Sequence, residues 1–497
     1  MKRISINIYK AIVCVSLLGF SSCTKTLEED PYSKISPNQF FTSEAQCIQA
    51  INGVYSGLSE LFGQEDLWKS IEQGTDLLLY VPTNDFNQEY TFTAASPGNV
   101  TGIWRKCFAS IANANMVINR VGKSNVTEAT KNRVLGEALY LRSLYYYMLT
   151  NSFGNVPMWT EELPVDQVSV LPRTPLEIVH EQLKKDLLQA ANYLPDTYPS
   201  SEVGRATKGA AMALLAKICL FDGKWADAAK YAQQVIDLGI YQLVDYDKLF
   251  DPNLKFRNNK ESIFEIQYLR VSSSNSNIVT NYYYTWFMPT KDANNKTYAG
   301  VDFGSNVFRG YENYYPSSVL VGMFEDGDKR KEVTLASGYN GQTFSRNLKP
   351  GRPWFGAKFW DFQANDRNSG KNLYFQRYSD VLLILAEAQN ELGNAPEALN
   401  WINKVRLEHG GLQKPLSNLS KDEIRLQIFK ERGIEFVGEF QRKWDLVRWK
   451  KLVEAVKSAA NDNPLGAKNV KDFHGIFPIP EAEITKNPNL LPQNQGY

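Results

Sequence analysis

Two stretches of this chain share a pattern that restricts its fold: one helix ends at a glycine, and a second helix follows at once. "AKICLFDGKWADAAKYAQQVI" breaks at Gly223, and "LAEAQNELGNAPEALNWINKVR" breaks at Gly393, 170 residues later. In each stretch an alanine, Ala228 or Ala398, stands five residues past the glycine. A small side chain there lets two antiparallel helices approach closely, as in tetratricopeptide-type hairpins. The pattern therefore predicts a helical repeat array that is interrupted between the two hairpins.

Helix starts elsewhere in the chain support a mostly α-helical fold. A side-chain oxygen at the N-cap can accept hydrogen bonds from the free backbone N–H groups of the first helical turn. Three segments carry this signal ahead of apolar residues at helical spacing: Ser43-x-x-Gln46, Thr174-Pro175-x-Glu177 and Ser420-x-x-Glu423. We expect a tetratricopeptide-like helical scaffold over about 36–240 and 376–460.

The remaining stretches lack helical periodicity. Residues 240–375 are rich in turn-forming sequence such as "SSSNSN" and "KDANNK", with short β-like pieces such as "SIFEIQY". Residues 75–103 are similarly irregular, and 461–497 are expected to be extended. Irregular segments of this length usually carry function. We therefore predict a loop-rich ligand-binding part at about 75–103 and 240–375, within one unit over 23–497.

Composition and motifs exclude several functions. Without residues 1–22, which contain three basic side chains, the formal charge falls from +1 to −2, and this argues against a nucleic-acid partner. The sequence contains no phosphate-binding loop, zinc-protease motif or serine-hydrolase elbow. "DANNKTYAGVDF" starts like a calcium loop but has Phe303 where a bidentate Glu should close it. We therefore predict no metal and no cofactor.

One acidic stretch could still supply the two carboxylates of a glycosidase. "KERGIEFVGEFQRKWDLVRW" contains several acids, but nearly every one has an arginine three residues away, within ion-pair reach. Such pairs are Arg432 with Glu435, Glu439 with Arg442, and Asp445 with Arg448. A structural charge network explains this spacing better than a catalytic pair, which needs a cleft and two unequal environments.

The N-terminus reads as a lipoprotein signal. Basic residues precede an apolar run of about ten residues, too short for the roughly 20 that span a bilayer. Two serines then lead directly into Cys23. We predict that residues 1–22 are removed and that Cys23 is lipidated. The other mature cysteines, Cys47, Cys107 and Cys219, form no C-x-x-C pair and are expected to be small buried residues.

Several blocks in this order resemble the SusD/RagB-like outer-membrane lipoproteins of Bacteroidetes. They are "FFTSEAQCIQAINGVYSGL", "GEALYLRSLYYYMLTNSFGNVPM", "RYSDVLLILAEAQNELG", "ERGIEFVGEFQRKWDLVRW" and the ending "FPIPEAEITKNPNLLPQNQGY". The resemblance implies four tetratricopeptide-like units packed against a variable loop-rich part. It also implies a lipid-anchored location on the outer face of the outer membrane. There the protein would capture oligosaccharides, without hydrolysing them, for a SusC-like TonB-dependent transporter.

The resemblance transfers no binding residues, so the candidates come from physical chemistry. A sugar ring needs exposed flat aromatic side chains with polar groups at their edges. The two irregular stretches supply the predicted ligand contacts: Tyr80, Asn84, Asp85, Phe86, Tyr90, Tyr283, Tyr284, Trp286, Tyr311, Tyr314 and Trp354, with Trp360 nearby. Trp286 is the first choice, because it stands in a run of aromatics that no helical or strand period could bury together.

Three other functions compete with glycan capture. Capture of peptides would suit a RagB-like member of the family. A surface glycosidase would turn over a labelled oligosaccharide. A pure interaction scaffold would bind partner proteins through its helices, and loss of Trp286 and Tyr283 would then change no small-molecule binding.

Overall fold

The computed structural model describes residues 40–269, 281–294, 296–304, 307–364 and 366–497. The predicted signal segment and Cys23 lie outside these residues. Within the described part, no helix is both long enough and apolar enough to cross a lipid bilayer.

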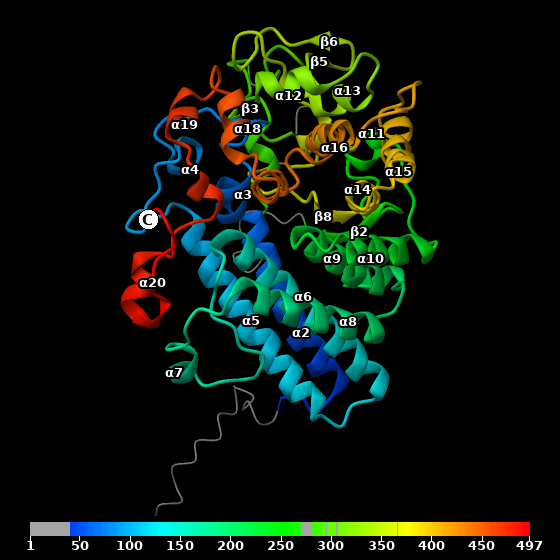
Figure 1. Ribbon diagram of the computed structural model, residues 1–497. Helices are drawn as coiled ribbons and strands as arrows, with labels where there is room; N and C mark the ends of the chain where they lie inside the picture. The colour runs from blue at the N-terminus through cyan, green and yellow to red at the C-terminus, as the bar shows by residue number, and fades with distance from the viewer. Residues whose placement is uncertain (1–39, 270–280, 295, 305–306, 365) are drawn as a thin grey trace, which may run out of the picture.

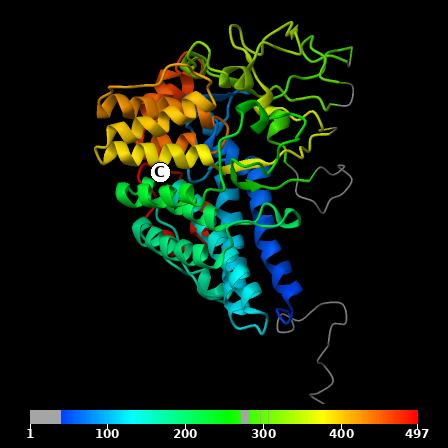
Figure 2. The same cartoon turned by 90° about the vertical axis from the view of Figure 1, so that its right-hand side faces the viewer.

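Nine long helices of the described residues form the scaffold and stack one on the next (Figures 1 and 2). They are α2 (Glu44–Gly63), α5 (Val100–Gly122), α6 (Glu128–Phe153), α8 (Leu176–Tyr193), α9 (Lys208–Phe221), α10 (Trp225–Asp237), α14 (Tyr378–Glu391), α15 (Ala395–Glu408) and α16 (Lys421–Phe436). Each packs mainly against its neighbour in this order, except that α16 packs on α14 as well as on α15.

The repeat array is continuous in space although it is interrupted in sequence. Helix α14 packs directly against α10, so the two predicted hairpins lie side by side, as Figure 2 shows for the yellow and green helices. Gly223 and Gly393 have φ of +67° and +89°, a left-handed conformation that glycine adopts without steric cost. Ala228 and Ala398 are fully buried at the helix contacts. The predicted hairpins are confirmed.

Two of the three predicted helix starts are confirmed. Complete capping boxes are present at Ser43 and at Ser420. The third prediction was wrong: α8 begins at Leu176 with Pro175 as its N-cap residue. Thr174 instead forms an isolated antiparallel bridge with Val156. The Leu176 N–H donates to the side-chain oxygen of Asn155, which lies well before it in the sequence, at 2.9 Å.

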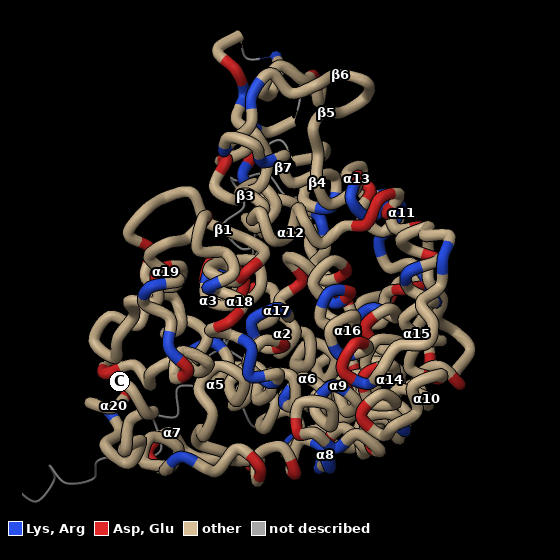
Figure 3. The backbone as a smooth tube through the Cα atoms, turned by 45° about the horizontal axis from the view of Figure 1, so that its top comes forward, with Lys and Arg blue, Asp and Glu red and all other residues tan. Residues whose placement is uncertain are grey.

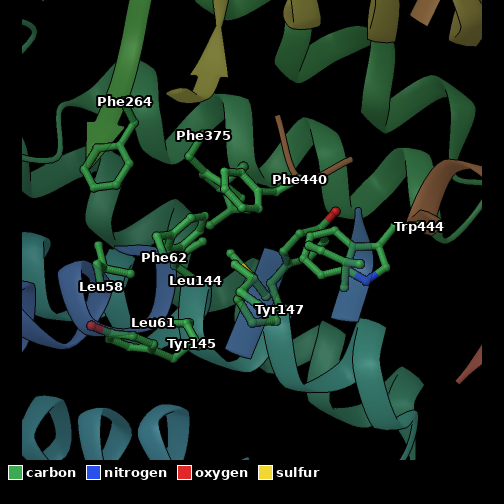
Figure 4. Close-up of a cluster of buried hydrophobic side chains, with 14 of the residues drawn as sticks. Leu58, Leu61, Phe62, Leu144, Tyr145, Tyr147, Phe264, Phe375, Phe440 and Trp444 are labelled. Atoms are coloured by element: carbon green, nitrogen blue, oxygen red, sulfur yellow. The ribbon is translucent and has the colours of Figure 1, made fainter. Parts of the chain in front are cut away.

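The scaffold is held by one large apolar core beneath the loop-rich part. Phe62 of α2 makes edge-to-face contacts with Phe375 and Phe440 at centroid separations of 5.9 and 5.1 Å. Tyr147 of α6 contacts Trp444 at 5.6 Å. Figure 4 shows how these rings interlock with leucines of α2 and α6. Segments that are more than 300 residues apart in sequence thus share one core. Cys47, Cys107 and Cys219 belong to the same core and are free and buried, as predicted.

Where the structure describes it, the loop-rich part has short strands, which form four two-stranded antiparallel sheets. The pairs are β1 (Leu78–Tyr80) with β3 (Tyr314–Pro316), β2 (Ser262–Ile266) with β8 (Leu373–Arg377), β4 (Leu335–Ala336) with β7 (Trp354–Phe355), and β5 (Gly338–Tyr339) with β6 (Gln342–Thr343). Short helices lie between them: α3 (Glu65–Ile71), α4 (Phe86–Glu89), α11 (Tyr246–Leu249), η2 (Tyr284–Trp286), α12 (Ser318–Met323), α13 (Arg330–Thr334) and η3 (Ala357–Phe359). The fold is therefore mostly α, with an irregular insertion carrying short β pieces, as the sequence predicts.

The C-terminal part differs from the expected extended segment. Beyond α17 (Arg442–Arg448) and α18 (Leu452–Ser458), the chain forms α19 (Pro464–Asn469), α20 (Glu481–Lys486) and two short 3-10 turns. Asn494 ties the final turn to the scaffold, because its side-chain nitrogen donates to the carbonyl oxygens of Phe153 and Phe477 at 2.9 and 2.8 Å.

Charges of both signs are interspersed around α16 and α17 (Figure 3).

Candidate ligand-binding site

Three aromatic side chains of the predicted set form a partly exposed group, which we call the aromatic shelf: Tyr80, Trp286 and Tyr311. The Trp286 ring stacks on Tyr80 with centroids 5.9 Å apart and planes 25° from parallel. The Tyr311 ring also contacts Trp286, with the two ring centroids 6.0 Å apart, and Tyr311 is 36% exposed. Residues from both irregular stretches, more than 200 positions apart, are thus brought together.

Backbone hydrogen bonds fix the three rings relative to one another. Strand β1 places Tyr80 opposite Tyr314 of β3. The chain just before β3 then pairs with η2, because the Asn313 N–H donates to the Trp286 carbonyl at 2.9 Å. The Tyr311 N–H donates to the carbonyl of Thr285, also at 2.9 Å. The shelf is therefore built on a hydrogen-bonded backbone rather than on free loops.

A buried layer supports the shelf from behind. Trp68 of α3 meets Trp286 edge-on at 5.0 Å and Tyr314 at 5.7 Å. The Tyr314 hydroxyl donates to the side-chain oxygen of Gln73 at 2.8 Å, and the Gln73 amide donates in turn to Asp85. Asp85 also accepts from the first backbone N–H groups of α4, so it holds the loop that follows Tyr80. These contacts keep the rings in one orientation.

One ion pair lies against the shelf. The Lys69 ammonium sits 4.7 Å from the Trp286 ring centroid and 5.4 Å from that of Tyr80, a cation–π geometry. Its carboxylate partner is Glu65, at 2.5 Å. Burial, together with the negative charges of Asp85 and Glu65, raises the pKa of the Tyr80 hydroxyl to about 12. The shelf therefore presents rings and hydrogen-bonding groups with no net charge of its own.

The other predicted contacts divide into two groups. Asn84 and Phe86 are exposed on the loop after Tyr80, and Phe86 is 47% accessible. Five predicted rings are instead buried, and each polar tip has a protein partner: Tyr90 with Gly74, Tyr283 with Gly438, Tyr284 with Asn372, Tyr314 with Gln73, and Trp354 with Arg346. Such rings offer no face to a ligand. Trp354 and Trp360 pack with Phe303 in a separate accessory core.

Lys69 and Glu65 were missed by sequence reasoning. They stand in α3, between the first long helix and the first irregular stretch. Their i, i+4 spacing is visible in the sequence, but it is equally typical of any solvent-exposed helix face. Only the fold brings them against Trp286.

The one group of potential metal ligands among the described residues is Glu261, His409 and Glu435, whose donor atoms lie within 4.8 Å of one another. His409 places Nδ1 2.9 Å from Glu435 and Nε2 2.9 Å from Glu261. Burial disfavours the charged ring, but the two carboxylates outweigh it and raise the pKa of His409 to about 9. An imidazolium donates from both nitrogens and has no lone pair for a metal. The geometry therefore fits a buried ion network.

The acidic stretch forms this network, as predicted, but with partly different partners. Asp445 and Arg448 pair at 2.8 Å as expected. Arg432, however, pairs with Asp380 and Asp445, rather than with Glu435. Arg442, which was predicted to pair with Glu439, pairs instead with Asp76 in the loop before β1, at 2.6 Å. Spacing along one helix could not reveal partners on other elements.

A second buried array has the order of a nucleophile, a base and an acid. Thr150 Oγ1 lies 3.1 Å from His180 Nε2, and His180 Nδ1 lies 2.6 Å from Asp222. Thr150 is 2% exposed, and its hydroxyl also contacts the Tyr146 carbonyl of its own helix at 3.0 Å. A substrate has no access to such a hydroxyl. The array instead ties α6, α8 and the end of α9 together.

These observations define a class: a helical-repeat protein with an irregular insertion that carries a partly exposed aromatic group. Two family models match the chain, "SusD family" over residues 335–497 and "Starch-binding associating with outer membrane" over residues 25–220. The SusD-like protein P2 of Formosa agariphila is 30% identical over 98% of this chain and 99% of that protein. The chain therefore belongs to the SusD family.

Solved structures agree with this assignment at the level of the fold. A SusD homologue from Bacteroides thetaiotaomicron superposes with a TM-score of 0.79 at 23% identity, covering 93% of this chain and 98% of that one. A laminarin-binding SusD-like protein superposes with a TM-score of 0.77 at 24% identity, covering 92% and 100%.

Proposed function

We propose that this protein captures oligosaccharides at the cell surface and delivers them, without cleavage, to a SusC-like TonB-dependent transporter of the outer membrane. The observation that carries the proposal is the aromatic shelf, in which Tyr80, Trp286 and Tyr311 stay partly exposed on a rigid support. The laminarin-binding relative of the same fold supports the ligand class.

The chemistry of the shelf suits a sugar ring. The C–H faces of a pyranose are apolar and stack on indole and phenol rings, while its hydroxyl rim needs hydrogen-bond partners. Lys69 lies over the Trp286 and Tyr80 rings and is paired with Glu65, and Asn84 is exposed on the loop after Tyr80. Together they supply both donors and acceptors. Because Lys69 and Glu65 neutralise each other, the site favours a neutral glycan segment.

The proposal includes the anchor and the location. Removal of residues 1–22 would make Cys23 the acylated first residue of a single unit over 23–497, held on the outer face of the outer membrane. A lipid-anchored binding protein keeps its ligand site near the transporter and remains free to move against it. No reaction is required of the protein in this role.

Titration calorimetry tests the proposal on soluble residues 24–497 with a panel of plant, host and microbial glycans. We expect heat with one glycan class, at least about tenfold weaker binding in Trp286→Ala, and no new reducing ends. Trp401→Ala is the matched control. Trp401 is a partly exposed tryptophan on α15, and its indole N–H donates a hydrogen bond to Glu397 of the same helix.

The alternatives give different results in the same experiment. New reducing ends would establish a glycosidase. Heat with peptides but with no glycan would establish peptide capture. Silence towards both classes, with the protein still folded, would leave only a protein-binding scaffold and would contradict the proposal.

A further inference from the structure

Two adjoining cavities lie on the protein away from the aromatic shelf, with volumes of about 410 and 590 Å³. They share Val203, Gly204, Arg205, Phe264 and Glu265 among their lining residues, so they adjoin, and we call the two together the edge groove. None of the shelf residues lines it. Its walls come from α2 and the loop between α8 and α9, and its floor comes from β2.

The floor of the edge groove includes the edge of a strand. Six consecutive residues, 262–267, line the two cavities. Successive side chains of a regular strand point to opposite faces, and β2 departs from this alternation at two register irregularities between Ser262 and Glu265. A floor that contacts every residue in turn includes the backbone of the strand as well as its side chains.

That edge of β2 has no strand partner among the described residues. Strand β2 pairs with β8 alone, from Ser262 opposite Arg377 to Ile266 opposite Leu373. Outside this ladder, the backbone of residues 263–267 makes one hydrogen bond in the described part of the chain, from the Gln267 side-chain nitrogen to the Glu265 carbonyl at 3.0 Å. A strand edge of this kind is a template for an added strand.

The aromatic side chains of the edge groove each contact another side chain of the protein. The Arg205 guanidinium lies 5.9 Å from the Tyr55 ring centroid, and that of Arg133 lies 5.3 Å from Tyr198. Tyr241 stacks on Tyr378 of α14 at 6.4 Å. These rings have protein neighbours, as Trp286 and Tyr80 of the aromatic shelf do in Lys69, so the feature that sets the edge groove apart is its strand edge.

We propose that the edge groove binds a short extended peptide, which adds to β2 as the third strand of the β2–β8 sheet. Backbone hydrogen bonds would supply the affinity, and alternate peptide side chains would enter the two cavities. At about 3.3 Å per residue, a floor of six residues holds a peptide segment of about six residues. The inference is independent of glycan capture and describes a second site.

A fluorescein-labelled peptide copying residues 369–378, "SGKNLYFQRY", is a suitable probe, because it already contains the strand that pairs with β2. Fluorescence anisotropy on residues 24–497 should show saturable binding below about 1 mM. The same peptide N-methylated at alternate amides should not bind, because it lacks the donors along one edge.

Val203→Trp tests the location of the peptide. Val203 is 48% exposed and lines both cavities, so an indole there fills the groove without disturbing the core. We expect binding at least about tenfold weaker. Val165→Trp adds the same bulk at a position 83% exposed on α7 (Val165–Val168), and Trp286→Ala removes the shelf. Both should bind the peptide as wild type does.

Three results would overturn the proposal. They are no binding by the wild-type protein up to about 1 mM, undiminished binding by Val203→Trp, or binding lost in Trp286→Ala. If Val203→Trp instead weakened binding of a glycan and the wild type ignored the peptide, the groove would be a carbohydrate site.

Discussion

Replacing Arg377 by methionine should cost more stability than replacing any exposed arginine, because Arg377 is the centre of the buried ion network. Its guanidinium is almost fully buried and donates to Glu261 at 2.7 Å, to Glu435 at 2.8 Å and to Glu439 at 2.7 and 2.8 Å. These contacts join β8 to α16 and to the end of the loop before β2.

The size of the effect follows from what remains after the substitution. Breaking a buried pair by removing one partner costs about 3–5 kcal/mol, because the other charge stays buried without compensation. Here three carboxylates lose a partner, but His409 still contacts Glu261 and Glu435, and Lys358 still contacts Glu439 at 2.7 Å. We therefore expect a loss of about 3–5 kcal/mol in the free energy of unfolding.

Urea unfolding, followed by circular dichroism and by tryptophan fluorescence, measures the effect. Arg425→Met is the matched control, since Arg425 pairs with Glu391 but its side chain is 47% exposed. Exposed pairs contribute about 0–1 kcal/mol, so this variant should unfold close to wild type. If Arg377→Met and Arg425→Met were equally stable, the network would not hold the scaffold to the loop-rich part.

Two further predictions concern the scaffold. The carboxylates that flank His409 hold its pKa near 9, above the ordinary 6.5. The stabilisation from the charged His409 ring is therefore complete below about pH 6.5 and is lost as the pH rises through about 9. Urea midpoints should fall over this interval in the wild-type protein and should fall less in His409→Gln. In α2, Gly57→Ala should destabilise the protein, because the added Cβ would lie 2.1 Å from Ser110 Oγ of α5. Gly53→Ala is the control: its Cβ meets nothing within 4 Å, so this variant should stabilise the protein by about 0.5–1 kcal/mol. Equal urea midpoints for the two variants would contradict the α2–α5 packing.

Local rules in the sequence were sufficient for the scaffold. The capping boxes at Ser43 and Ser420 and the glycine breaks at Gly223 and Gly393 depend on residues within a few positions, so they could be predicted. The cap at Thr174 failed because a distant backbone partner, Val156, holds that residue in a bridge. Non-local pairing overrode the local signal there.

The candidate site could be predicted only in part. Aromatic residues outside helical periodicity pointed to the two stretches that form the aromatic shelf, including Trp286, Tyr80 and Tyr311. Sequence could not tell these from Tyr283, Tyr284 or Trp354, because burial depends on which segments pack above each ring. Lys69 could not be predicted for the same reason, because its contact with Trp286 depends on the packing of α3 against η2.

We propose that the aromatic shelf holds the captured ligand. The decisive test is a crystal structure of residues 24–497 with the oligosaccharide that gives the largest heat in calorimetry. We expect a sugar ring stacked on Trp286 or Tyr311, with its hydroxyls near Lys69 and Glu65. Ligand density elsewhere, above all in the edge groove with the shelf empty, would contradict it.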